Sequence, residues 1–187
     1  MLIVEGPDGV GKTTLCRKLL ESLPTHIYAH FSRLPAGFDY YWGYVERASR
    51  YIVQDRFHLS EVAYARARGD SSRLDTESYQ ILDGHLRLLG AYTILVTATQ
   101  DLLASRWGPD QMYSLEKTLA AGRAFDQVHE EHAINRIVPD IDFRVRCTVH
   151  RPWVSDEEIA AILEAYRVRQ SLIDDVARRR RLGLGRA

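Results

Sequence analysis

The first fourteen residues decide the fold: Met1-Leu2-Ile3-Val4-Glu5-Gly6-Pro7-Asp8-Gly9-Val10-Gly11-Lys12-Thr13-Thr14. An apolar run leads into the segment Gly6 to Thr13, which fits the pattern G-x-x-x-x-G-K-[ST]. In this pattern a strand enters a glycine-rich loop whose backbone N–H groups form a nest for anions, and the loop opens a helix. A glycine-rich turn with a chance lysine would explain neither the strand before it nor the helical pattern after it. The stretch therefore predicts a phosphate-binding loop.

The chemistry of this loop predicts ATP and Mg²⁺ as ligands. The positive end of the following helix adds to the anion nest. Lys12 is expected to reach the β- and γ-phosphates, and the Thr13 hydroxyl is expected to hold Mg²⁺. The predicted nucleotide contacts are Gly6, Pro7, Asp8, Gly9, Val10, Gly11, Lys12, Thr13 and Thr14.

A second motif supplies the rest of the expected site. The apolar run Tyr51–Gln54 ends in Asp55-Arg56, and an aspartate at the end of such a strand is the expected second Mg²⁺ position. Arg56 would face the transferred phosphate. Asp8 points a carboxylate toward the acceptor, or alternatively only favours the turn. Arg106 is expected on a lid that excludes water, with solvation as the alternative for it and for Arg123.

Apolar runs alternate with helical patterns along the whole chain of 187 residues. This alternation predicts a three-layer α/β/α fold with a parallel sheet covered on both faces. The expected strands are Leu2–Glu5, Ile27–Phe31, Tyr51–Asp55, Tyr92–Thr97 and Phe143–Val149. The expected helices are Lys12–Leu23, Ser60–Arg68, Thr76–Leu89, one or two helices in Arg106–Asn135, and Ser155 to about Asp175. We expect one kinase domain over residues 1–175, a lid near residues 104–125, and a basic tail over residues 176–187.

Composition bounds the class of protein. Lys and Arg total 25 and Asp and Glu total 25, so net charge gives no general attraction to nucleic acid or to anionic membranes. Cys16 and Cys147 are expected to be small buried apolar residues, and no zinc-ligand spacing occurs. No run approaches membrane-spanning length, and the chain opens on its first strand. We therefore expect a cytoplasmic protein, in the host cytoplasm if the source is viral.

The two motifs together resemble the thymidylate kinase family of P-loop nucleoside monophosphate kinases. Glu5 to Thr14 is similar to the family's E-G-x-D-G-x-G-K-[ST]-T, and Asp55 to Tyr64 is similar to D-R-Y-x-x-S-x-x-A-Y. Ser32 to Gly37 faintly resembles T-R-E-P-G-G, with Leu34 where glutamate is usual. Beyond the first 65 residues the resemblance is one of pattern alone.

The resemblance implies the five-strand order 2-3-1-4-5, ATP·Mg²⁺ on Lys12 and Thr13, and a small lid that carries Arg106. It also implies a homodimer, for which the stripe Tyr79, Leu82, Leu86 and Leu89 is one candidate interface and core packing is the alternative. The acceptor pocket is implied to contain Asp8, Arg33, Arg56, Ser60 and Tyr64.

The chain departs from the family where the acceptor base would be recognised. Only 22 positions separate Arg33 from Asp55, which is much shorter than in thymidylate kinases. The candidates for contacting a base are Tyr40, Tyr41, Trp42, Tyr44, Arg47 and Arg50, of which we select Tyr44 and Arg47. Ordinary packing of this aromatic cluster is the alternative.

Three hypotheses follow. The leading one is an ATP- and Mg²⁺-dependent transfer of the γ-phosphate to a thymidine-like nucleotide, such as dTMP or a related deoxynucleoside monophosphate, as in a small phage-type nucleotide kinase. The second hypothesis is that the open acceptor side accommodates a polymer. Viral relatives of thymidylate kinase phosphorylate 5-hydroxymethyluracil bases in DNA during base hypermodification. In that case the basic tail would contact backbone phosphates. The third is a regulatory ATPase without a second substrate, with the acceptor motif as the evidence against it.

Overall fold

The computed structural model describes residues 1–32, 35, 37, 39–108, 113–134, 144–149 and 154–181, with only the backbone described for 132–134, 144–149 and 180. Within these ranges strands and helices alternate along the chain, as expected. The strands are β1 (Leu2–Glu5), β2 (Ile27–His30), β3 (Ile52–Asp55), β4 (Tyr92–Ala98) and β5 (Arg144–Val149). The helices are α1 (Lys12–Glu21), α2 (Tyr40–Val45), α3 (His58–Arg68), α4 (Thr76–Leu88), α5 (Gln100–Arg106), α6 (Leu115–Ile134) and α7 (Asp156–Arg181).

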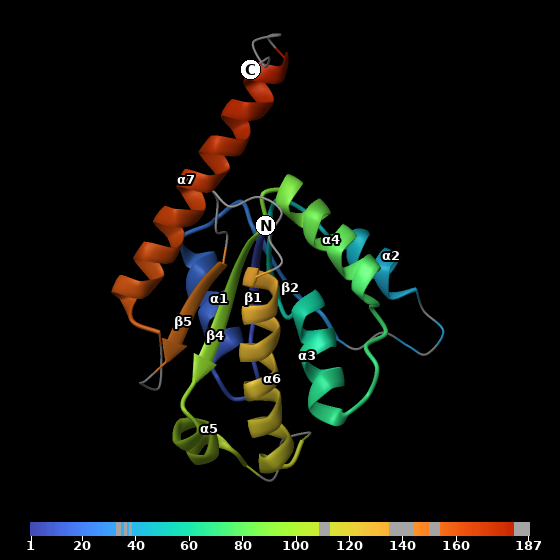
Figure 1. Ribbon diagram of the computed structural model, residues 1–187. Helices are drawn as coiled ribbons and strands as arrows, with labels where there is room; N and C mark the ends of the chain where they lie inside the picture. Colours follow the sequence, from blue (N-terminus) through green and yellow to red (C-terminus); the bar gives the residue numbers. More distant parts are fainter. Residues whose placement is uncertain are drawn as a thin grey trace.

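The five strands form one parallel sheet in the order β2-β3-β1-β4-β5, which confirms the predicted order (Figure 1). β1 lies at the centre and is buried along its whole length. Its register places Val4 beside Asp55 of β3 and Ile94 of β4. Because all strands run the same way, their carboxyl ends meet at one edge, where loops bring polar side chains together.

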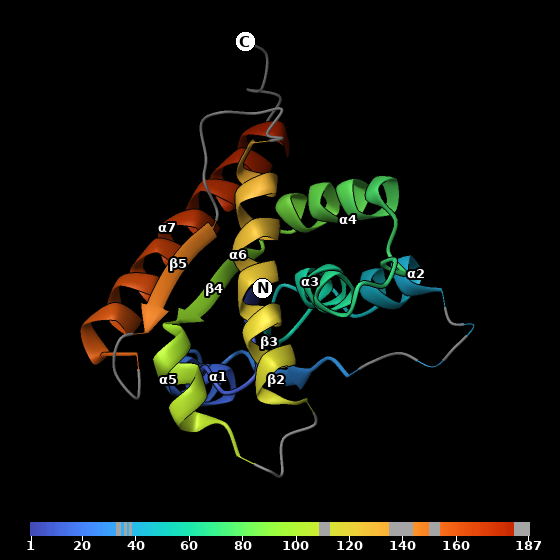
Figure 2. The same ribbon diagram turned by 60° about the horizontal axis from the view of Figure 1, so that its bottom comes forward.

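Helices cover both faces of the sheet, which confirms the three-layer α/β/α class. Neighbouring side chains of β1 point to opposite faces, so Ile3 belongs to one apolar cluster and Leu2 and Val4 belong to the other. The first cluster joins the sheet to α2, α3, α4 and α6, and the second joins it to α1, α5 and α7. Figures 1 and 2 show α3 and α6 on one side of the strands and α1 on the other.

The observed helices differ from the predicted ones in some of their bounds and in number. The chain leaves α1 at Ser22, two residues before the expected end. Helices α2 and α5 were not predicted: each is short, and each begins at a side-chain cap, Asp39 for α2 and Thr99 for α5. Helix α7 continues to Arg181, so residues 176–181 of the expected tail are helical.

The apolar stripe of α4 packs into the body of the protein. Tyr79, Leu82 and Leu86 are buried in the cluster shared with α2, α3 and α6, and Leu89 is half-buried. Packing is therefore the observed role of this stripe, whereas Ile81 and Leu88 of the same helix are 52% and 79% exposed. None of the described helices is both long enough and apolar enough to cross a membrane.

Gly6 is required at the exit of β1. Its φ is +144°, and a Cβ there would lie 2.2 Å from the carbonyl oxygen of Val96. Gly6→Ala is expected to lower the free energy of unfolding in urea by about 2–4 kcal/mol, because the clash adds to backbone strain. The matched control is Gly84→Ala in α4, where a Cβ meets open space and a gain of about 0.5–1 kcal/mol is expected. Equal effects of both substitutions would contradict this account.

Candidate active site

The predicted phosphate loop wraps around the amino end of α1. Gly9 and Gly11 have φ of +82° and +93°, and Gly11 is the residue that caps α1. These left-handed conformations curl the loop so that its backbone surrounds a concave space. A cavity of about 280 Å³ opens beside it. The cavity is lined by Asp8, Gly9, Gly11, Lys12, Thr13, Thr14, His30, Asp55 and Arg56.

Two further loop residues lie against the rest of the protein. The Pro7 ring is near Gly122 of α6, since a Cβ added to Gly122 would lie 3.9 Å from Pro7 Cγ. Val10 is buried in the core.

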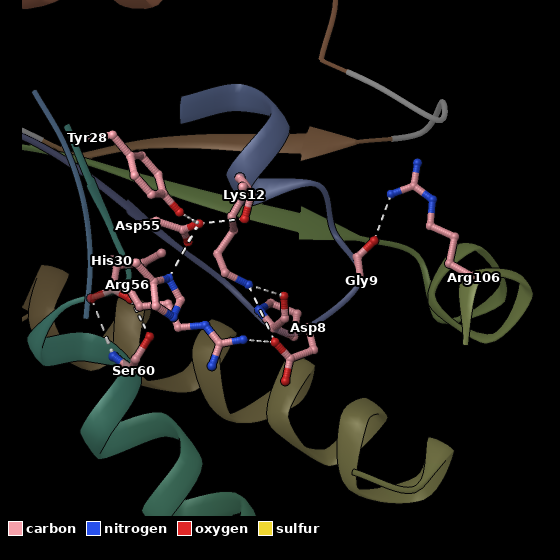
Figure 3. Close-up of polar contacts among 12 residues, drawn as sticks. Asp8, Gly9, Lys12, Tyr28, His30, Asp55, Arg56, Ser60 and Arg106 are labelled. Carbon is pink, nitrogen blue, oxygen red and sulfur yellow. Dashed lines mark hydrogen bonds and ion pairs between the residues drawn. The ribbon is translucent and has the colours of Figure 1, made fainter. Parts of the chain in front are cut away.

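Lys12 is folded back into its own loop. Its side chain is only 5% exposed, and Nζ donates to the Pro7 carbonyl at 2.6 Å and lies 3.9 Å from Asp8 Oδ1 (Figure 3). Burial lowers the pKa of Lys12 to about 8, against the opposing attraction of Asp55 and Glu5. In this structure the ammonium group is therefore held by the Pro7 carbonyl within the loop.

Thr13 and Asp55 meet at the carboxyl edge of the sheet. Thr13 Oγ1 donates to Asp55 Oδ2 at 2.5 Å, and Tyr28 from β2 donates to the same oxygen at 3.0 Å. His30 Nδ1 lies 3.7 Å from it. Within the described residues, Asp55 Oδ1 is buried and has no hydrogen-bond partner. An unsatisfied buried carboxylate oxygen beside a threonine hydroxyl fits a hydrated Mg²⁺, which takes few protein ligands when phosphates complete its shell.

Arg56 turns back toward the loop. Its backbone has φ of +65°, in the left-handed region, and its N–H donates to the Val4 carbonyl at 3.0 Å. Its guanidinium forms an ion pair with Asp8 and lies 5.5 Å from the centre of the Tyr64 ring. Asp8, Arg56 and Tyr64 are therefore brought together as the sequence predicted, next to Lys12.

Ser60 lies deeper than expected, because Glu5 occupies its hydroxyl. The Glu5 carboxylate is fully buried at the amino end of α3 and accepts the Ser60 hydroxyl at 2.5 Å. It also accepts the backbone N–H groups of Phe57, Leu59 and Ser60. Burial raises the pKa of Glu5, whereas His58, Ser60 and Lys12 oppose that rise. The sequence predicted no such role for Glu5; its only signal was a carboxylate at the end of an apolar strand.

The described part of the expected lid segment contacts the phosphate loop at one point and packs into the core at another. Arg106, at the end of α5, donates to the Gly9 carbonyl at 3.0 Å, so it lies beside the loop (Figure 3). Farther along the segment, Ala121, Ala124 and Phe125 of α6 are buried in the core, whereas Arg123 is exposed.

Tyr113, which the sequence analysis missed, stacks on Tyr64 with ring centres 5.7 Å apart. Its carbonyl accepts the Trp107 indole N–H at 2.9 Å. Tyr64 thus contacts both the Arg56 guanidinium and the Tyr113 ring, and Tyr113 lies two residues before α6 begins at Leu115.

The two residues selected for contacting a base lie at an aromatic cluster, Tyr44 inside it and Arg47 at its exposed edge. Tyr44 is 1% exposed and stacks on Phe31 at 4.4 Å, with Phe57 edge-on at 4.8 Å. Arg47 lies over Phe31 and donates to the Gly43 carbonyl at 2.8 Å. Tyr44 is therefore part of the core, whereas Arg47 is exposed beside it. Arg33, also expected in the pocket, lies outside the described residues.

Several solved structures have a similar arrangement of elements. The YorR protein from Bacillus subtilis, crystallised in complex with phosphorylated GDP, matches with a TM-score of 0.68 and 18% identity, over 87% of this chain and 92% of that one. Thymidylate kinase from Candida albicans matches with a TM-score of 0.56 and 15% identity, over 90% and 91% of the two chains. The chain shares the fold of these two proteins. No protein-family model matches it, and no curated protein matches it in sequence.

The lowered pKa of Lys12 predicts a pH dependence for ATP. Below about pH 8 the ammonium form dominates, and above it the charge that binds phosphate is lost. We expect kcat/KM for ATP to fall above pH 8 by about tenfold per pH unit at constant ionic strength. Lys12→Arg keeps its charge and serves as the control, with lower activity but no fall in this range. A wild-type profile that stays flat to pH 10 would be inconsistent with the prediction.

Glu5→Gln tests the cap of α3. An amide offers one accepting oxygen where the carboxylate offers two, and it removes the negative charge from the helix terminus. The free energy of unfolding in urea is expected to drop by about 2–3 kcal/mol. Glu77→Gln, at the exposed first turn of α4, is the matched control, and its effect is expected to stay within about 0.5 kcal/mol. A Glu5 variant as stable as this control would show that the cap contributes little.

Proposed function

We propose that the protein is an ATP- and Mg²⁺-dependent phosphotransferase that moves the γ-phosphate to the phosphate of a thymidine-like nucleoside monophosphate. The observation that carries the proposal is the position of Arg56. Among the described residues, one lysine and one arginine line the loop cavity, Lys12 and Arg56. Lys12 belongs to the donor loop, whereas Arg56 reaches the same space from the acceptor side.

The donor half of the site is built for a triphosphate. The loop backbone and the amino end of α1 would hold the β-phosphate, with Lys12 toward the γ-phosphate. Thr13 and Asp55 would hold Mg²⁺, which neutralises charge on the β- and γ-phosphates. Arg106 already lies against Gly9 and would cover the transferred group from the lid side.

The acceptor half favours an anion. Arg56 is held by Asp8 and by the face of Tyr64, so its guanidinium is fixed before a substrate binds. A phosphate acceptor is already ionised and needs no strong base, so positioning and charge neutralisation supply the rate. Tyr64 and Tyr113 would then lie beside the sugar.

A hydroxyl acceptor is the second candidate, as in a 5-hydroxymethyluracil base within DNA. The observation that favours it is the short acceptor wall, in which α2 has six residues and Trp42 is 57% exposed. An exposed indole is a suitable stacking surface for a base taken out of a duplex. In this case Asp8 would accept the hydroxyl proton.

Transfer of labelled γ-phosphate from ATP·Mg²⁺ tests both candidates, with Lys12→Ala as the blank. We expect label in a nucleoside diphosphate when dTMP or another monophosphate is offered. Label found only in DNA that contains 5-hydroxymethyluracil would favour the second candidate. Free phosphate alone, whatever the acceptor, would favour a regulatory ATPase.

Arg56→Ala is expected to lower kcat/KM for the monophosphate by about 100-fold while ATP binding is kept. The reason is that in this proposal Arg56 neutralises the acceptor phosphate, whereas the loop backbone and Lys12 hold ATP. Arg66→Ala, in α3 and in an exposed ion pair with Glu131, is the control and should leave transfer unchanged. Equal losses in ATP binding and transfer would place Arg56 on the donor side instead. Asp8→Asn adds a further distinction, since it should be milder for a phosphate acceptor than for a hydroxyl acceptor.

A further inference from the structure

A histidine lies on the metal side of the loop cavity, and the proposed function gives it no role. His30 is the last residue of β2, and it lines the cavity together with Thr13 and Asp55. Its side chain is 44% exposed, whereas that of Asp55 is 1% exposed. Among the described residues that line this cavity, His30 supplies the one imidazole group. Imidazole is the side-chain group that most often binds metal ions in proteins.

The register of the sheet places His30 directly beside Asp55. The two residues are partners in the parallel ladder of β2 and β3, and side chains of partner residues point to the same face of a sheet. His30 Nδ1 lies 3.7 Å from Asp55 Oδ2, and the Thr13 hydroxyl lies 2.5 Å from the same oxygen (Figure 3). Two strands and the first turn of α1 therefore bring an imidazole nitrogen, a carboxylate and a hydroxyl to one point.

The separation of His30 from Asp55 suits two ligands of one metal ion. At 3.7 Å the two atoms are too far apart for a hydrogen bond, and Asp55 Oδ2 already accepts the hydroxyls of Thr13 and Tyr28. Nitrogen and oxygen ligands lie about 2.0–2.2 Å from a divalent ion such as zinc, so two ligands of one ion lie roughly 3–4 Å apart. Asp55 Oδ1, which has no hydrogen-bond partner within the described part of the chain, is a further oxygen for such an ion.

Tyr28 supports this arrangement from the same strand. It lies two residues before His30, so the two side chains are on one face of β2. Its hydroxyl donates to Asp55 Oδ2 at 3.0 Å. Carboxylates that bind metal ions are typically held by such hydrogen bonds, which fix their orientation. The edge strand therefore supplies one ligand and orients another.

We propose that His30 is a ligand of the cation that Thr13 and Asp55 hold, and that it makes the site favour a first-row transition ion such as Mn²⁺ or Co²⁺ over Mg²⁺. This inference rests on the proposed function, which places a cation beside the nucleotide phosphates. Imidazole nitrogen is a good ligand for transition ions, whereas Mg²⁺ is held by oxygen atoms and keeps several of its waters. A site of oxygen ligands alone would lack this additional preference.

Pulsed EPR of Mn²⁺ bound to the full chain with ADP tests the ligand directly. The chain is made without a histidine tag, so that the tag cannot supply a nitrogen. In the wild type we expect the spin-echo modulation of a directly bound imidazole nitrogen, and we expect it to change when the chain contains ¹⁵N-labelled histidine. His30→Asn should abolish this modulation. His85→Asn, in α4 and outside the residues that line the cavity, is the matched control and should retain it.

Titration calorimetry of the same ADP complex tests the preference between ions. The affinity for Co²⁺ divided by the affinity for Mg²⁺ is expected to fall at least about tenfold in His30→Asn, because the nitrogen ligand is lost. His85→Asn should leave this ratio within about twofold of the wild-type value. A ratio that His30→Asn does not change would overturn the inference.

These measurements need no phosphate acceptor, so the inference and the proposed function can fail separately. Binding of Mn²⁺ with ADP but without nitrogen modulation would show that His30 is not a ligand, and the proposed function would stand. Nitrogen modulation in a chain that transfers no phosphate to any monophosphate would support the inference and overturn the proposed transfer. A chain whose ADP complex binds no divalent ion would overturn both.

Discussion

The buried carboxylate of Glu5 joins the two halves of the site. It ends the central strand, and its oxygens accept three backbone N–H groups and a hydroxyl at the start of α3. A fully buried carboxylate is tolerable only with such donors, and the amino end of a helix supplies them along with a favourable dipole. The phosphate loop begins directly after Glu5. The loop and α3 are therefore fixed relative to each other before any ligand binds.

The conformation of Arg56 follows from that constraint. It lies between the end of β3 and the capped end of α3, and its φ of +65° is a conformation that costs a non-glycine residue about 1–2 kcal/mol. The flanking elements can hold this strain because each is bound to β1: β3 by its ladder and α3 by Glu5. The side chain then returns to Asp8 in the loop. Two polar contacts therefore connect the segment from Glu5 through the phosphate loop with the segment from Arg56 into α3. One joins Glu5 to the start of α3, and the other joins Asp8 to Arg56.

The sequence could predict the fold and the meeting of Thr13 with Asp55 because both depend on regular rules. Continuous apolar strands alternate with helices, and parallel strands bring their carboxyl ends to one edge. The contact of Tyr28 with Asp55 depends on the register of an edge strand, which no local pattern reports. Tyr44 resembled a base-stacking residue because it lies in a short aromatic and cationic segment, but aromatic side chains pack on one another as well as on a base, and Tyr44 stacks on Phe31. Helix α2 was missed because its single cap, Asp39, is followed by less than two turns.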